Sequence, residues 1–360
     1  MKILRPIAIL SSCLLLTASA VAQISLAPPA AQTPPAAGKP ASKPKAKPAA
    51  AAKKPMAPAA TPEPAATPAP TATVTPAPAP DDPNVDLVYG AYQRGQYKTA
   101  FDLATRRAQD NGDPKAMTML GELYANAMGI KRDYAKAADW YKRAADGGDR
   151  EAMFALAMLR LSGRGGPVNR EEAAKLLASS AKLGNPKAAY NLALLYLDGQ
   201  TLPQDLKRAA ELFRVAADAG NPEAQYALAT FYKEGTGVAK DIEKAVRLLQ
   251  AASLADNVDA EVEYAIALYN GTGTPKNEAA AVALLRKAAK QDSPIAQNRL
   301  ARVLVTGQGA PMDKIEGLKW HIVAKTAGKG DPMLDEAFAD LSPEDRARVE
   351  AAARKWLGTK

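Results

Sequence analysis

The sequence predicts an all-α protein, a right-handed α-solenoid of helix-turn-helix repeats. Six alanines recur every 36 residues without an insertion, and most residues around them recur with the same period; these are Ala116, Ala152, Ala188, Ala224, Ala260 and Ala296. Units of this length stack so that each contacts only its neighbours. Such an array exposes an extended surface instead of enclosing a pocket, so we expect binding before catalysis.

Each unit carries a helix N-cap three residues before its alanine. Asp, Asn and Ser side chains accept hydrogen bonds from the free amides of a first helical turn. The caps are Asp113, Asp149, Asn185, Asn221, Asn257 and Ser293. Proline suits the first helical position, and it follows four of the caps, as Pro114, Pro186, Pro222 and Pro294. The first helix of every unit should therefore begin in register.

A glycine eleven residues after the alanine should end this helix, because glycine permits the positive φ of a helix C-terminus. These glycines are Gly163, Gly199, Gly235, Gly271 and Gly307, and Ala127 is the exception. A second helix opens at a further cap in each unit, namely Asp133, Asn169, Asp205, Asp241, Asn277 and Asp313. Its stripe of residues at helical spacing, such as Ala137, Tyr141, Ala209 and Phe213, should form the core.

This pattern resembles the Sel-one-like repeat (SLR) family, relatives of tetratricopeptide repeats. The stretches DYAKAADWYKRAA at 133–145 and GTGVAKDIEKA at 235–245 carry the resemblance most clearly, and six units cover residues 113–328. The units depart from the consensus at a few positions, where we expect altered local packing; these are Arg160 and Leu268 in place of tyrosine, Gly317 in place of alanine, and Asp292 in place of glycine.

Segments of different character flank the six units. Residues 81–112 contain A-Y-x-x-G-x-Y-x-x-A at 91–100, which looks like a tetratricopeptide unit and should form the N-terminal capping repeat. Residues 329–360 should provide a C-terminal capping helix that starts at Ser342 and packs Trp356 on the last unit. Terminal units need atypical sequences because one of their faces meets water.

The first 22 residues indicate a secretory signal peptide. Two basic residues precede an apolar run at 6–16, and Ala20-Val21-Ala22 forms a cleavage site. We expect cleavage after Ala22, with Ala20 as the alternative. Cys13, the chain's one cysteine, formally completes a lipoprotein signal, but the most apolar stretch would then lie beyond the cleavage point. No other stretch approaches the roughly 20 apolar residues of a membrane helix, so we expect no transmembrane span in the mature chain.

Residues 23–80 form a Pro/Ala/Lys-rich linker, which we expect to be disordered. It holds 16 of the 28 prolines and almost no large apolar side chain. Its six lysines face a single acid, Glu63, so much of the net charge of +9 lies here and the repeats are nearly neutral. The basic balance is therefore no argument for nucleic acid. The segment resembles envelope spacers, which favours the periplasm, with full secretion as the alternative and weak contact with anionic envelope polymers as a secondary role.

The sequence offers little for catalysis. His321 is the chain's one histidine, and it occupies the core slot held by Tyr141, Phe213 and Leu249 in other units, so we interpret it as structural. With no cysteine left after cleavage, the chain has no zinc-type constellation. Gly163 to Gly166 are no phosphate loop because a helix precedes them. We therefore expect no enzyme activity, no cofactor and no metal.

By resemblance to tetratricopeptide arrays, positions two, three, six and nine after each alanine line a concave face. We take the following residues as candidate binding residues, comparatively free to serve a ligand: Phe154, Met158 and Leu161; Tyr190, Asn191, Leu194 and Leu197; Tyr226, Thr230 and Lys233; Glu263, Ile266 and Tyr269. This largely apolar and aromatic set suits an extended or helical peptide. The alternative for Tyr190 and Tyr226 is packing against the preceding unit.

These features predict an exported, non-enzymatic scaffold that binds a protein or peptide in the cell envelope. The resemblance implies a second hypothesis, a periplasmic regulator that holds a sensor kinase or another envelope signalling protein inactive. A hypothesis of another class, a cell-envelope enzyme or glycan-binding module, would need a polar cleft that the sequence does not show. The partner and the oligomeric state lie beyond the sequence.

Overall fold

The computed structural model describes residues 86–358, and within this range every regular element is an α-helix. The helices are α1 (Leu87–Gln93), α2 (Tyr97–Asp110), α3 (Pro114–Asn126), α4 (Tyr134–Asp146), α5 (Arg150–Ser162), α6 (Arg170–Lys182), α7 (Pro186–Asp198), α8 (Leu206–Asp218), α9 (Pro222–Glu234), α10 (Ile242–Leu254), α11 (Val258–Asn270), α12 (Glu278–Lys290), α13 (Pro294–Thr306), α14 (Lys314–Thr326), α15 (Pro332–Ala339) and α16 (Pro343–Gly358). The predicted all-α solenoid is confirmed. The predicted signal peptide and linker lie outside the described residues.

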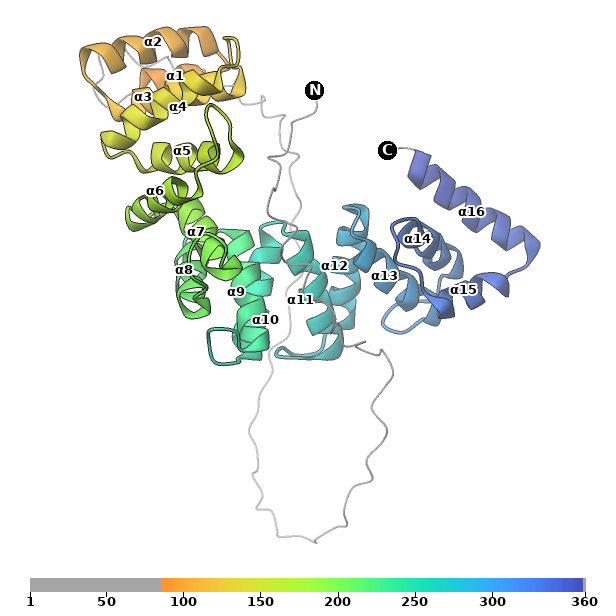
Figure 1. Cartoon of the computed structure of the whole chain (residues 1–360). Coiled ribbons are helices and arrows are strands. Elements are labelled where there is room, and N and C mark those ends of the chain that lie inside the picture. Colours follow the sequence, from red (N-terminus) through yellow and green to blue (C-terminus); the bar gives the residue numbers. More distant parts are fainter. Residues whose placement is uncertain (1–85, 359–360) are drawn as a thin grey trace, which may run out of the picture. The chain divides into compact units, whose positions relative to one another are not determined.

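Twelve of these helices form six pairs, from α3 with α4 to α13 with α14, that follow one another in chain order (Figure 1). Every predicted cap is found. Each first helix starts after the expected Asp, Asn or Ser, and each second helix after the expected Asp or Asn, whose side chain accepts from a backbone amide of the first turn. The caps therefore set the 36-residue register.

The turn inside most pairs depends on glycine at two points; the first pair has Ala127 at the first point, and the third pair has Thr201 at the second. The five predicted C-cap glycines are left-handed, and Ala127 adopts the same conformation with a φ of 58°. The second glycine of the G-x-G sequence serves close packing: a Cβ on Gly165 would lie 2.2 Å from the carbonyl oxygen of Tyr134, and one on Gly237 2.3 Å from that of Leu206. These two glycines let their turns approach the second helix of the preceding repeat.

The core follows the predicted stripe of the second helices. Ala137, Tyr141, Ala209 and Phe213 are buried, and each second helix from α4 to α12 packs both on its own first helix and on the first helix of the next repeat. The ring of Phe213 lies 5.3 Å from that of Phe231, which is on the first helix of the following repeat. Apolar burial is therefore continuous along the array, as a solenoid requires.

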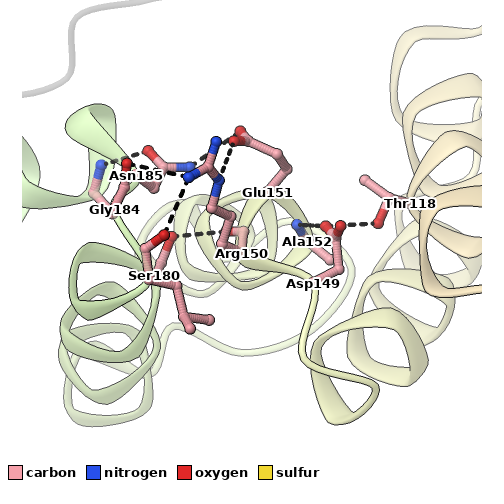
Figure 2. A network of polar contacts seen from close by, with 10 residues as sticks. Thr118, Asp149, Arg150, Glu151, Ala152, Ser180, Gly184 and Asn185 are labelled. Carbon is pink, nitrogen blue, oxygen red and sulfur yellow. Dashed lines mark hydrogen bonds and ion pairs between the residues drawn. The ribbon is translucent and has the colours of Figure 1, made fainter. Parts of the chain in front are cut away.

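Polar contacts also join successive repeats. Asp149 accepts the amide of Ala152 at 2.7 Å and, on the same oxygen, the hydroxyl of Thr118 from the preceding repeat at 2.9 Å (Figure 2). Within the pair itself, the Ser180 hydroxyl on α6 donates to the carbonyl of Arg150 on α5 at 2.7 Å. The cap that starts a helix thus also ties that helix to its neighbours.

Two departures from the consensus have local compensations. In two other repeats the position of Arg160 holds a tyrosine whose ring lies under a basic side chain, Tyr196 under Arg208 and Tyr232 under Lys244. Arg160 instead forms an ion pair of 2.9 Å with Glu172. An ion pair therefore replaces a cation-π contact at the same place between the first and second helix of the pair. Asp292 carries the positive φ, 67°, that glycine adopts in other repeats.

The C-terminal segment contains one more helix than the sequence predicts. α16 starts after Ser342 as expected and packs on α14, where Trp356 meets Trp320 edge to face with ring centroids 4.9 Å apart. The predicted packing of Trp356 on the last unit is confirmed. The short α15 was missed, although Asp331 precedes Pro332 as Asp113 precedes Pro114.

Candidate binding surface

All candidate binding residues lie on the first helices of four consecutive repeats, α5, α7, α9 and α11, and each is half-buried. First helices of neighbouring repeats come into direct contact where α3 meets α5 and where Lys233 on α9 meets Glu263 on α11. The 13-residue helices start at equivalent caps, so equal offsets bring equivalent side chains to one side of the array. These side chains form a row that continues from repeat to repeat, and we keep the name concave face for it.

The apolar part of the concave face lies on α5 and α7. Phe154, Met158 and Leu161 pack against one buried cluster that includes Leu192 and Leu195. Tyr190, Leu194 and Leu197 pack against the next cluster, around Phe213. Because these side chains are half-buried, each anchors on the core and still presents apolar surface to solvent.

Tyr190 has a packing role, but its partner differs from the expected one. Its ring centroid lies 5.7 Å from that of Phe213, which belongs to the second helix of the same repeat and not to the preceding unit. Burial, with a smaller effect of Glu223, raises the pKa of the Tyr190 hydroxyl. The tyrosine is neutral at physiological pH and can present its ring edge and hydroxyl to a ligand.

The polar part of the concave face is occupied by contacts within the protein. Lys233 on α9 forms an ion pair of 2.7 Å with Glu263 on α11, and the Tyr226 hydroxyl donates to the same carboxylate at 3.3 Å. Burial, then the charge of Glu263, raises the pKa of Tyr226. The expectation that these side chains are free to serve a ligand is therefore wrong, because the three residues connect two repeats.

The remaining polar candidates are held by the backbone. Thr230 donates to the carbonyl of Tyr226 at 3.2 Å, and the Asn191 amide donates to the carbonyl of Lys187 at 2.8 Å, each one turn back in its own helix. Tyr269 donates to the carbonyl of Gln308 in the next repeat at 3.1 Å. Ile266 packs against the C-terminal apolar cluster.

The candidates chosen from the sequence omit the sixth repeat, where Asn298, Arg299 and Arg302 on α13 occupy the same offsets as Tyr226, Glu263 and Ile266. Arg302 forms an ion pair with Asp331, and the Asn298 amide donates to the same carboxylate at 3.2 Å. Applying the same offsets to one more repeat would have identified all three residues.

His321 lies buried in α14, with Nε2 2.8 Å from the Asp335 carboxylate. The hydrogen bond from Lys325, followed by that from His321, lowers the pKa of Asp335. No nucleophile is paired with this histidine in residues 86–358, and no group of His, Cys, Asp and Glu in that range could hold a metal ion. The histidine therefore connects α14 to α15 and suits packing better than catalysis.

None of the helices in the described part of the chain is long and apolar enough to cross a membrane. The surface it presents is that of a helical array with a half-buried apolar row along one side.

Known proteins share this architecture. The chain is 26% identical to a Sel1 repeat protein from Oxalobacter formigenes, over 67% of this chain and 98% of that one, with a TM-score of 0.60. A protective antigen of uropathogenic Escherichia coli with an SLR fold is 23% identical over 75% of this chain and 67% of its own, with a TM-score of 0.53. The search of curated proteins finds no match.

The family comparison is more specific than these structural likenesses. The model of the Sel1 repeat matches six consecutive segments, at 114–149, 150–185, 186–221, 222–257, 258–293 and 294–329. Together these segments cover more than half of the chain, and they follow the helix pairs described above. The protein therefore belongs to the Sel1 repeat family.

Proposed function

We propose that the protein is an exported scaffold without enzymatic activity, which binds a segment of a partner protein on its concave face. Sel1 repeat proteins are generally protein-interaction scaffolds. The observation that carries the proposal for this chain is the apolar row on α5 and α7, formed by Phe154, Met158, Tyr190 and Leu194. Partly exposed apolar and aromatic side chains aligned on adjacent helices suit an extended or helical segment.

Substitution of the apolar row tests this proposal. Met158→Gln and Leu194→Gln together should abolish capture of the partner, because two apolar anchors become polar. The control is Val215→Gln, which makes the same chemical change at a half-exposed valine on α8, away from the row. Thermal unfolding of each variant checks the fold. Capture that survives the double substitution but fails in the valine variant would place binding on the second helices instead.

Export is part of the same proposal and rests on the sequence of the first 22 residues. A free periplasmic protein that starts at Gln23 is expected from the Ala20-Val21-Ala22 site. Intact-mass analysis of the protein recovered from the envelope measures this start. A chain that begins at a lipid-modified Cys13 would contradict both the cleavage site and the free periplasmic state.

A further inference from the structure

The sixth repeat places on the concave face a positive charge that has no hydrogen-bonded or ion-paired partner among the described residues. Arg299 on α13 is half-buried, and no residue within 86–358 gives its guanidinium a hydrogen bond or an ion pair. Its equivalent one repeat earlier, Glu263, is paired with Lys233. Arg299 therefore lacks the ion pair that the equivalent residue makes one repeat earlier.

The neighbouring carboxylate cannot neutralise this charge because it is already used. One oxygen of Asp331 accepts from Arg302 and Asn298, and the other accepts the amide of Met333 as the cap of α15. Two guanidinium groups thus share one carboxylate, and this corner keeps a net charge of about +1. Burial, followed by the charge of Arg302, lowers the pKa of Arg299, but guanidinium groups in proteins stay protonated.

The repeat geometry explains why the preceding repeat supplies no counter-charge to Arg299. In the preceding pair of repeats, Glu263 is reached by Tyr226 and Lys233, at offsets two and nine. One repeat later the same offsets hold Val262 and Tyr269. Valine supplies no polar group, and the tyrosine hydroxyl is directed to the carbonyl of Gln308. A half-buried charge without a partner is costly, so a ligand that supplied a counter-charge would gain a strong contact.

We propose that Arg299 binds a carboxylate of the partner segment held on the concave face. This inference rests on the proposed scaffold function and names the chemistry of its ligand. A single net positive charge suits a monoanion, and a planar guanidinium suits the two oxygens of a carboxylate. The chain's own segment 23–80 does not fit, because it carries six lysines and one glutamate. The carboxylate comes from an acidic side chain or from the C-terminus of the partner.

A random peptide library selected on the mature chain, with free and amidated C-termini as separate arms, tests the inference. If acidic residues are enriched among peptides with free and with amidated C-termini, the bound carboxylate belongs to an acidic side chain. If only peptides with a free C-terminus bind, it is the C-terminal carboxylate. Arg299→Gln should weaken the best peptide at least tenfold, about 1.4 kcal/mol. Arg299→Lys should lose less than the glutamine variant. Arg106→Gln is the matched control, since Arg106 is exposed on α2 and also lacks a protein partner within 86–358.

The matching change in the peptide completes the test. Replacing its carboxylate by an amide should cost the wild-type protein the same tenfold and cost Arg299→Gln nothing further. The free Arg299→Gln protein should unfold at the same temperature as wild type or a higher one, because it loses an unpaired charge; a clear loss of stability would mark the arginine as structural.

Several results would overturn the inference: peptides without acidic enrichment, equal affinity for both proteins, or tighter binding of inorganic phosphate than of the carboxylate peptide. The proposed function is tested separately. If peptides lose affinity for the Met158→Gln, Leu194→Gln protein but not for the Arg299→Gln protein, the result supports the scaffold function and refutes carboxylate binding by Arg299. Peptides indifferent to all three substitutions would refute both.

Discussion

Charge reversal at the Lys233–Glu263 ion pair tests whether the concave face also holds the repeats together. The side chains are 41% and 29% exposed, so water screens them only in part. Partly exposed pairs of this kind contribute about 0.2–1 kcal/mol. Lys233→Glu removes this attraction and adds a repulsion of similar size, and the repeats should lose about 1–2 kcal/mol of stability.

Urea unfolding followed by circular dichroism measures this loss as a lower midpoint. The swapped variant, Lys233→Glu with Glu263→Lys, should recover most of the stability, and 1 M salt should reduce the difference between the variants. Lys240→Glu is the control, because Lys240 is exposed in the same repeat and has no ion pair within the described residues. A single variant as stable as wild type, or a swapped variant no better than the single one, would refute the reasoning.

Three further predictions concern the core, the C-terminal end and the linker. Leu228→Ala should cost about 2–5 kcal/mol in urea unfolding, since this side chain is 2% exposed within a packed cluster; a change below 1 kcal/mol would show that the core collapses around the gap. The lowered pKa of Asp335 means that its stabilising contacts with Lys325 and His321 are present above the unfolded-state pKa of about 3.9 and are lost as the pH falls through the folded value. Asp335→Asn should therefore reduce the fall in melting temperature between pH 6 and pH 2, and an unchanged fall would count against this role. Deletion of 23–80 should leave the melting temperature unchanged, because the segment has almost no large apolar side chain to bury; a drop of several degrees would show that it packs on the repeats.

The sequence predicted the helices well because their boundaries depend on local chemistry. An Asp or Asn cap and a left-handed glycine act within a few residues of themselves, so a repeating pattern reveals them. Ala127 shows the limit of this reasoning, since it takes the left-handed conformation that its position requires without being glycine. α15 was missed although its cap and proline were visible, because it falls outside the 36-residue period.

The contacts of the concave face were harder to predict because they join residues of different repeats. Lys233 and Glu263 are 30 residues apart, and their pairing depends on how two first helices are spaced and rotated. For the same reason the sequence predicted only altered local packing at Arg160 and not its ion pair with Glu172. Offsets within one repeat identify which side chains share a face, but the charges they meet depend on the next repeat.

The placement of α16 determines how the stack of helices stops. A seventh unit in register would place its cap at residue 329, which is lysine, whereas the chain caps α15 two residues later at Asp331. The shift takes α15 out of phase with the earlier first helices. α16 then packs on α14 about as extensively as each second helix packs on the first helix of the next repeat. The site where another repeat, or another molecule's leading helix, would dock is thus already filled. A helix from another molecule would have to displace α16 before it could stack on this side of α14.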